Sequence, residues 1–178
     1  MDADAEAGQK NRPLSYSEVI IILWKGHWCM LALTIENKPK ILLQQFLAMD
    51  LYTRLQDERE FTILIDDKIF YYQPLFPILE LVEACYSWLQ QPIGDFEYFT
   101  IEADDNPMLK FTHASNGFLI SSPWQEFLCA TEFTKEEIIC FCEEIVNQVI
   151  RTEDKGETRK SKRKVLLPWQ RNEERSHR

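Results

Sequence analysis

Four carboxylates in the middle of the chain have the spacing to do chemistry: Glu97, Glu102, Asp104 and Asp105. Paired carboxylates can bind a divalent ion or act as general acid and base. They can equally form an acidic patch for a basic partner, or a solvated turn, which is the usual environment of such side chains. A tryptophan and a further glutamate follow shortly afterwards and can extend an acidic patch. We therefore predict six partner-binding residues: Glu97, Glu102, Asp104, Asp105, Trp124 and Glu126.

Other reactive residues favour no enzyme class. Cys140 and Cys142 are two positions apart on an expected helix, so their thiols face apart and cannot readily share one metal ion. His113, Ser115 and Asp105 can be drawn as a catalytic triad, but closeness in sequence is not geometry, and a histidine at a turn edge is the simpler interpretation. The five glycines form no phosphate-binding loop. We predict no catalytic residue, metal or cofactor, and an enzyme with an unrecognised site stays a third hypothesis.

The charge distribution separates an acidic body from a basic tail. Residues 155–178 contain nine Lys or Arg and three Glu, a net charge of +6, which leaves −15 on the rest of the chain. The tail includes a compact basic cluster that can neutralise phosphates, act as a transport address or simply aid solubility. This cluster consists of Lys160, Lys162, Arg163 and Lys164. The sequence thus predicts nucleic-acid binding, if there is any, in the tail.

Length and composition indicate one domain with two tails. The 178 residues, 45% of them hydrophobic, suit a single domain over 14–151, after an acidic leader at 1–13 and before a basic, disordered tail at 152–178. No apolar run approaches the roughly 20 residues of a membrane helix, and residues 1–13 contain no apolar signal core. The cysteine count of five is odd, as in reduced proteins, so we expect a cytoplasmic protein with no membrane contact.

The acidic cluster lies in a predicted three-stranded meander over Phe96–Glu102, Met108–His113 and Phe118–Ser121. Asn116-Gly117 joins the last two strands, because this pair readily takes the positive φ angles of a tight turn. Alternation predicts one buried face on the three strands. That face would contain Phe99, Ile101, Leu109, Phe111, Phe118 and Ile120.

Upstream of the meander, the apolar and turn patterns predict further strands. We expect five strands and a short helix. Three strands lie at Tyr16–Lys25, Trp28–Glu36 and Ile41–Phe46, followed by a helix near Asp50–Asp57. The last two strands, Phe61–Ile65 and Ile69–Gln73, form a hairpin that Pro74 closes. The segment after Ile41 can alternatively begin a helix that reaches Leu55.

Two amphipathic helices complete the predicted domain. Residues 75–91 have apolar side chains at spacings of three and four, with Glu80 on the polar side. Residues 134–151 begin with the capping box Thr134-Lys135-Glu136-Glu137. We therefore predict an α+β fold, in which an antiparallel sheet of hairpins and the meander pack on two main helices.

Several segments resemble a known family. They are the hairpin over 61–73, Pro74-Leu75-Phe76-Pro77, Trp88 in the helix, Asp95-Phe96-Glu97-Tyr98, residues 106–111 and residues 121–127. Together they resemble a family of small bacterial α+β proteins classed as a domain of unknown function and, more distantly, the immunity proteins that neutralise bacterial toxins. The resemblance covers about residues 50–149. It implies a fold and no catalytic residues.

These observations favour a non-enzymatic binding protein, immunity-like, with an acidic surface for a basic protein partner. Such a surface would accelerate association through electrostatic steering. Trp124 would lie on its rim, unless this residue caps the core instead. Nucleic-acid association through the basic tail is the alternative.

Overall fold

A computed structural model describes residues 20–21 and 31–152 of the chain. Its helices and antiparallel sheets confirm the predicted α+β class. Within these residues there are two four-stranded sheets and one pair of short parallel strands. The predicted leader and tail lie outside the described residues, as do most of the first predicted strand and part of the second. No helix in the described part of the chain is long and apolar enough to cross a membrane.

The first sheet is antiparallel and has the order β1-β2-β4-β5. Its strands are β1 (Ile20–Ile21), β2 (Leu31–Ile35), β4 (Glu58–Ile65) and β5 (Lys68–Pro77). The predicted hairpin is confirmed as β4 and β5, in which Ile65 pairs with Lys68. Asp66 and Asp67 between them have φ angles of 51° and 62°. Two consecutive positive φ angles are the signature of a type I′ turn, which suits the twist of a hairpin.

Strand β5 corrects two predictions. Pro74 does not close the hairpin, because β5 continues to Pro77 and pairs again with β4 after a register shift. A proline is tolerated there because β5 is an edge strand. Helix α3 (Ile78–Gln90) therefore starts three residues later than predicted, directly after the strand. Leu75, expected on the apolar face of this helix, instead lies on the strand with 67% of its surface exposed.

The second sheet contains the predicted meander and one more strand, in the order β6-β7-β8-β9. The strands are β6 (Phe96–Tyr98), β7 (Leu109–His113), β8 (Phe118–Ser121) and β9 (Glu132–Phe133). The predicted buried face is wrong for the first strand. Phe96 and Tyr98 are buried opposite Phe111 and Leu109, whereas Phe99 and Ile101 are exposed. The alternation ends because β6 stops at Tyr98 and the chain leaves the sheet.

Position 117 requires glycine because a side chain there would clash with a neighbouring strand, and not because of a positive φ angle. The turn between β7 and β8 is present, but the φ angles of Asn116 and Gly117 are not positive, contrary to the prediction. A Cβ atom on Gly117 would lie 2.5 Å from the backbone oxygen of Phe133 in β9. The turn and β9 can therefore approach only because residue 117 has no side chain.

Helix α4 (Lys135–Val149) begins as predicted. The Glu137 amide donates to Thr134 Oγ1 at 3.2 Å, and the Thr134 amide donates to Glu137 Oε2 at 2.7 Å. This reciprocal pair is the capping box. The helix ends at Val149, and the next two residues, Ile150–Arg151, form β10.

The segment before β4 is more helical than predicted. The strand expected over Ile41–Phe46 is only β3 (Ile41–Leu42), which pairs in parallel with β10. The chain then forms α1 (Leu43–Ala48) and α2 (Leu51–Leu55). Asp50 caps α2, because its side chain accepts a hydrogen bond from the Thr53 amide at 2.8 Å. The short helix predicted near Asp50 is thus confirmed.

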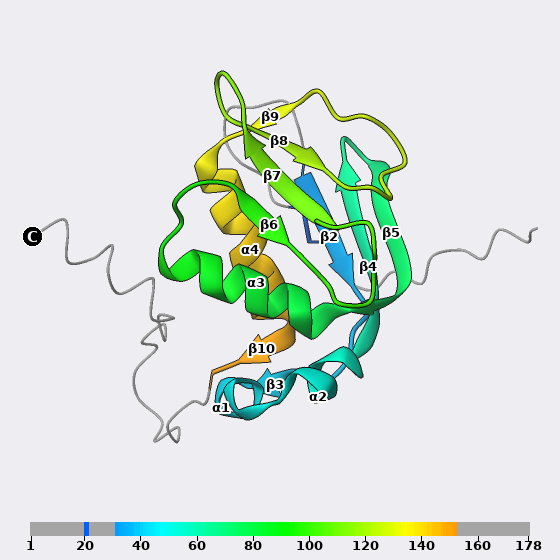
Figure 1. Cartoon of the computed structure of the whole chain (residues 1–178), viewed down its shortest axis with the longest axis vertical. Coiled ribbons are helices and arrows are strands. Elements are labelled where there is room, and N and C mark those ends of the chain that lie inside the picture. The colour runs from blue at the N-terminus through cyan, green and yellow to red at the C-terminus, as the bar shows by residue number, and fades with distance from the viewer. Residues whose placement is uncertain (1–19, 22–30, 153–178) are drawn as a thin grey trace, which may run out of the picture.

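The two long helices link the two sheets. Helix α4 contacts both α3 and β2, and α3 contacts β6 and β4. In Figure 1, α3 crosses in front of α4, while α1, α2, β3 and β10 lie together at the bottom of the view. Phe111 on β7 meets Phe141 on α4 with ring centroids 5.4 Å apart, so the second sheet and the helix share one core.

We expect Thr134→Ala to lower the free energy of unfolding by about 1 kcal/mol, the usual contribution of an N-cap. Urea denaturation followed by circular dichroism measures this loss. Asn147→Ala, at an exposed position of the same helix, is the control and should change stability much less. An unchanged stability for Thr134→Ala, with helix content intact, would contradict the capping role.

We expect Gly117→Ala to destabilise the fold by about 1–3 kcal/mol, because the added Cβ must displace the β9 backbone or distort the turn. Thermal unfolding of this variant, compared with Ser115→Ala on the same exposed turn, tests the assignment. A melting temperature equal to that of Ser115→Ala would show that β9 can move away at no cost.

Candidate functional site

A pocket of about 170 Å³ opens where the end of β5 meets the loop between β6 and β7. Strand β5 forms one wall, Tyr98 of β6 and the loop after it form another, and the segment after β8 supplies Trp124. The lining residues are Tyr71, Gln73, Leu75, Phe76, Pro77, Tyr98, Thr100, Glu102, Ala103, Met108 and Trp124. Two of the six residues predicted to bind a partner, Glu102 and Trp124, therefore lie at one pocket.

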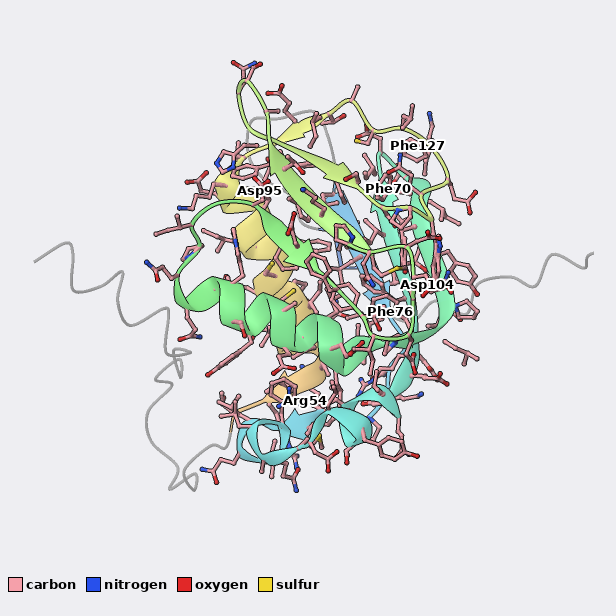
Figure 2. All side chains as sticks on the ribbon, in the orientation of Figure 1. Arg54, Phe70, Phe76, Asp95, Asp104 and Phe127 are labelled. Atoms are coloured by element: carbon pink, nitrogen blue, oxygen red, sulfur yellow. The ribbon has the colours of Figure 1, made fainter. Side chains whose placement is uncertain are left out.

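Aromatic packing holds the two main walls together. The ring centroids of Phe76 on β5 and Tyr98 on β6 are 5.6 Å apart, and those of Tyr71 and Phe76 are 6.0 Å apart. Figure 2 shows Phe76 at this junction and Asp104 on the nearby loop. The rings of Tyr71, Phe76 and Tyr98 are all buried, so the floor of the pocket is aromatic and closely packed.

Asn106 fixes the loop that contains the carboxylates. Its Oδ1 accepts from the Thr100 amide at 3.1 Å, while its Nδ2 donates to the carbonyls of Thr100 at 2.9 Å and Ala103 at 2.6 Å. The Glu102 amide also donates to Thr100 Oγ1 at 3.2 Å. These bonds replace the strand ladder that ends at Tyr98, and they hold Glu102 at the pocket.

The segment after β8 is fixed in a similar way. The Trp124 amide donates to Ser122 Oγ at 3.2 Å, and the Glu126 amide donates to the Phe70 carbonyl of β5 at 2.9 Å. Phe127 meets Phe70 with ring centroids 5.7 Å apart. Trp124 itself is 42% exposed, so it lines the pocket and does not cap the core.

Two tyrosines and a glutamate form a buried polar group behind the pocket. Tyr98 Oη donates to Glu80 Oε2 at 3.4 Å. Tyr71 is only 2% exposed, and its hydroxyl has no hydrogen-bond partner in the described structure. Burial raises the pKa of both tyrosines, so both hydroxyls stay protonated at neutral pH.

Glu80 corrects another prediction, because it is buried rather than on the polar face of its helix. Burial raises the pKa of its carboxyl, and the negative charges of Glu102 and Glu83 raise it further. Hydrogen bonds from Thr100 and Tyr98 lower it in part. Glu80 is thus a carboxyl whose charged form is disfavoured, close enough to the pocket to feel Glu102.

The other four residues predicted to bind a partner do not line the pocket. Glu97 Oε1 is 2.7 Å from Lys110 Nζ across β6 and β7, so its charge is largely compensated. Asp104 and Asp105 are exposed on the loop beside the pocket, and Glu126 is exposed two residues beyond Trp124. The basic cluster of the tail lies outside the described residues.

The catalytic and metal hypotheses gain no geometric support. His113 Nδ1 lies 2.8 Å from Asp95 Oδ1, so the partner of this histidine is Asp95 and not Ser115 or Asp105. The amide of His113 donates to the same carboxylate, which lowers the pKa of Asp95. Across 20–21 and 31–152, no group of three His, Cys, Asp or Glu side chains could hold a metal ion.

Sequence reasoning missed Tyr71, Tyr98, Glu80 and Leu75 as site residues. Only the burial of Glu80 could have been suspected from the sequence, since this acidic residue is flanked by apolar residues, namely Ile78, Leu79, Leu81 and Val82. The two tyrosines have the pattern of ordinary strand residues, and nothing in the sequence shows that the two sheets place them at one pocket.

The fold and the pocket define a small α+β protein with a partly open aromatic site and no recognisable catalytic centre in its described residues. Residues 35–152, more than half of the chain, match the family described as "Domain of unknown function (DUF7878)". The chain belongs to this family, as the resemblance to a domain of unknown function implied. No curated protein and no solved structure matched the chain significantly.

The raised pKa of Glu80 predicts a pH-dependent stability. A carboxyl with a pKa above its ordinary value of 4.5 in the folded state favours the fold below that value, and this contribution is lost as pH rises through the folded-state pKa. We expect Glu80→Gln to match the wild type at low pH and to be more stable than it near pH 7, since the amide is neutral and still accepts from Tyr98.

Thermal unfolding from pH 4 to pH 8 measures this difference. Glu144→Gln on α4 provides the control, because it removes a carboxylate of the same type at a partly exposed position far along the chain. A constant stability difference between Glu80→Gln and the wild type at every pH would overturn the assignment.

Proposed function

We propose that the protein is a non-enzymatic protein-binding module, immunity-like, that presents an acidic surface to a basic protein partner. The observation that carries the proposal is the meeting of Glu102 and Trp124 at one pocket with the exposed Leu75. A carboxylate, an indole and an aliphatic side chain around a hollow resemble the anchoring centre of a protein interface. The bacterial, cytoplasmic setting is part of the proposal and rests on the sequence.

Charge supports a basic partner. Glu102, Asp104 and Asp105 are all exposed on one loop, and none of them has a cationic partner within salt-bridge distance among the described residues. Uncompensated like charges on a rigid loop attract an oppositely charged partner and increase the association rate. Glu97, which is paired with Lys110, contributes less to this attraction.

Exposed apolar side chains support a protein rather than a small ion as the partner. Leu75 is 67% exposed, and Phe99 and Ile101, on either side of the pocket residue Thr100, are 55% and 69% exposed. Apolar side chains that gather near a charged loop are characteristic of an interaction surface. We call Leu75, Glu102, Asp104, Asp105 and Trp124 the acidic face.

The basic tail supports an alternative proposal, nucleic-acid association. The tail carries +6 beside a body of −15, so only the tail can attract phosphates. In that case, replacing Lys160, Lys162, Arg163 and Lys164 with Ala would remove nucleic-acid binding and lower its salt slope by up to about four contacts. An enzymatic role stays the third hypothesis, for which no described geometry argues.

If the acidic face is the binding surface, changing Glu102, Asp104 and Asp105 to Lys should slow association with the partner and flatten its salt dependence. Affinity capture from a bacterial lysate with mass spectrometry identifies the partner, and stopped-flow kinetics at several salt concentrations measure the rates. The fold should be retained, because all three side chains are exposed.

The control changes the net charge equally at another place, with Glu36, Glu136 and Glu144 replaced by Lys. It should reduce association much less than the loop variant does, since the partner senses local as well as net charge. If both triple variants bind a basic partner as the wild type does, the acidic face is not the binding surface. Retention of nucleic acid alone would favour the tail.

A further inference from the structure

The walls of the pocket suit one particular kind of side chain. Four aromatic rings line it: those of Tyr71, Phe76 and Tyr98 are buried in the floor, and that of Trp124 is 42% exposed. Glu102 supplies a carboxylate, and no lining residue is cationic. The faces of aromatic rings attract cations through their quadrupoles, and tryptophan does so most strongly. Rings and a carboxylate together favour a positively charged group over a neutral or negative one.

Trp124 and Glu102 are the exposed aromatic and charged residues of the lining. Trp124 is 42% exposed and Glu102 is exposed on its loop, whereas the Tyr71 hydroxyl is buried behind the pocket. An indole face beside a carboxylate can stack on a planar cation and also pair with its charge.

The surrounding charges exclude an anion. Glu102 lies at the pocket, and its charge reaches Glu80 behind Tyr98. Asp104 and Asp105 follow on the same loop. A carboxylate or phosphate ligand would therefore meet like charges from the loop, whereas a cation would be stabilised by them.

The size of the pocket indicates a single side chain rather than a large ligand. A volume of about 170 Å³ is below the usual range of drug-sized sites, which begins near 300 Å³. Between the two basic side chains, arginine fits better. Its planar guanidinium stacks on aromatic rings, is less strongly hydrated than an ammonium group and has five donors for several acceptors at once.

We infer that the pocket binds one arginine side chain of the basic protein partner, an inference that rests on the proposed function. The guanidinium stacks on Trp124 and donates to the carboxylate of Glu102. Asn106 and Ser122 position the loop and Trp124 through their hydrogen bonds. The loop aspartates outside the pocket act at longer range on the rest of the partner.

Capped pentapeptides with one central residue between glycines provide the probe. NMR titration of the full-length protein follows the indole signal of Trp124. An arginine peptide should shift this signal and bind about tenfold more tightly than a citrulline peptide, which has a similar shape but no charge. A lysine peptide should bind between the two. Equal affinities for arginine and citrulline would overturn the inference.

Single substitutions test the contacts within the pocket. Trp124→Ala and Glu102→Gln should each weaken binding of the arginine peptide about tenfold, because the first removes the stacking ring and the second removes the negative charge that faces the guanidinium. Isothermal titration calorimetry measures the affinity of Trp124→Ala, which has no indole signal at this position. Tyr72→Phe, on an exposed residue of β5 that does not line the pocket, is the control and should bind like the wild type. Neither pocket variant should lower the melting temperature much, since both side chains are exposed.

The same variants separate this inference from the proposed function when the captured partner is used. Weaker partner binding by Trp124→Ala, together with a slower association of the loop variant, supports both. If reversal of Asp104 and Asp105 weakens partner binding but Trp124→Ala does not, the charged loop stands as the binding surface and the arginine pocket falls. If no variant weakens binding, both fall.

The basic tail of the chain is a competing source of arginine. A protein that ends at Thr152 should bind the arginine peptide with the affinity of the full chain. Much tighter binding by the shortened protein would show that the pocket holds a residue of its own tail, which would overturn the assignment to a partner.

Discussion

The contact between Phe76 and Tyr98 joins the two halves of the structure. Phe76 is near the end of β5, one residue before the N-cap of α3, and Tyr98 is the last residue of β6. Their rings, 5.6 Å apart, connect the edge of the first sheet to the edge of the second. Because both rings are buried in the common core, the strand-to-helix junction and the β6–β7 loop cannot move independently.

The pocket is a consequence of this junction. Two twisted sheet edges that meet through large rings cannot fill all the space between them, and the loop after Tyr98 closes only part of it. Asn106 then replaces the missing strand hydrogen bonds and fixes the loop in place. Of the two buried tyrosine hydroxyls, that of Tyr98 donates to Glu80, while that of Tyr71 has no partner among the described residues.

The proposed function depends on the carboxylates that have no ion-pair partner among the described residues. Glu97 forms an ion pair in the sheet and Asp95 binds His113, so both serve the fold. Among the described residues, the carboxylates of the loop have no such partners; all three are exposed, and Glu102 lines the pocket together with Trp124. A surface of this kind combines long-range attraction with a small aromatic anchor, which suits recognition of a basic protein better than it suits catalysis.

Local patterns in the sequence determined the elements whose causes are local. The capping box of Thr134, the hairpin at Asp66-Asp67 and the last two meander strands depend on residues close in sequence, and all were predictable. Glu102 and Trp124 were predictable as candidates from residue type and position alone. The α+β class also followed, because periodicities of two and of 3.6 residues alternate along the chain.

Only the tertiary structure decided where β5 ends, which face of the β6 segment is buried and why Glu80 lies inside. Each of these depends on contacts between segments far apart: Phe76 with Tyr98, Glu80 with Tyr98, and Gly117 with Phe133. Leu75 fits a helical pattern, but pairing across the sheet extends the strand past it, since ladder hydrogen bonds and ring burial outweigh a weak local preference. The pocket belongs to this second group, because no single segment of the sequence contains it.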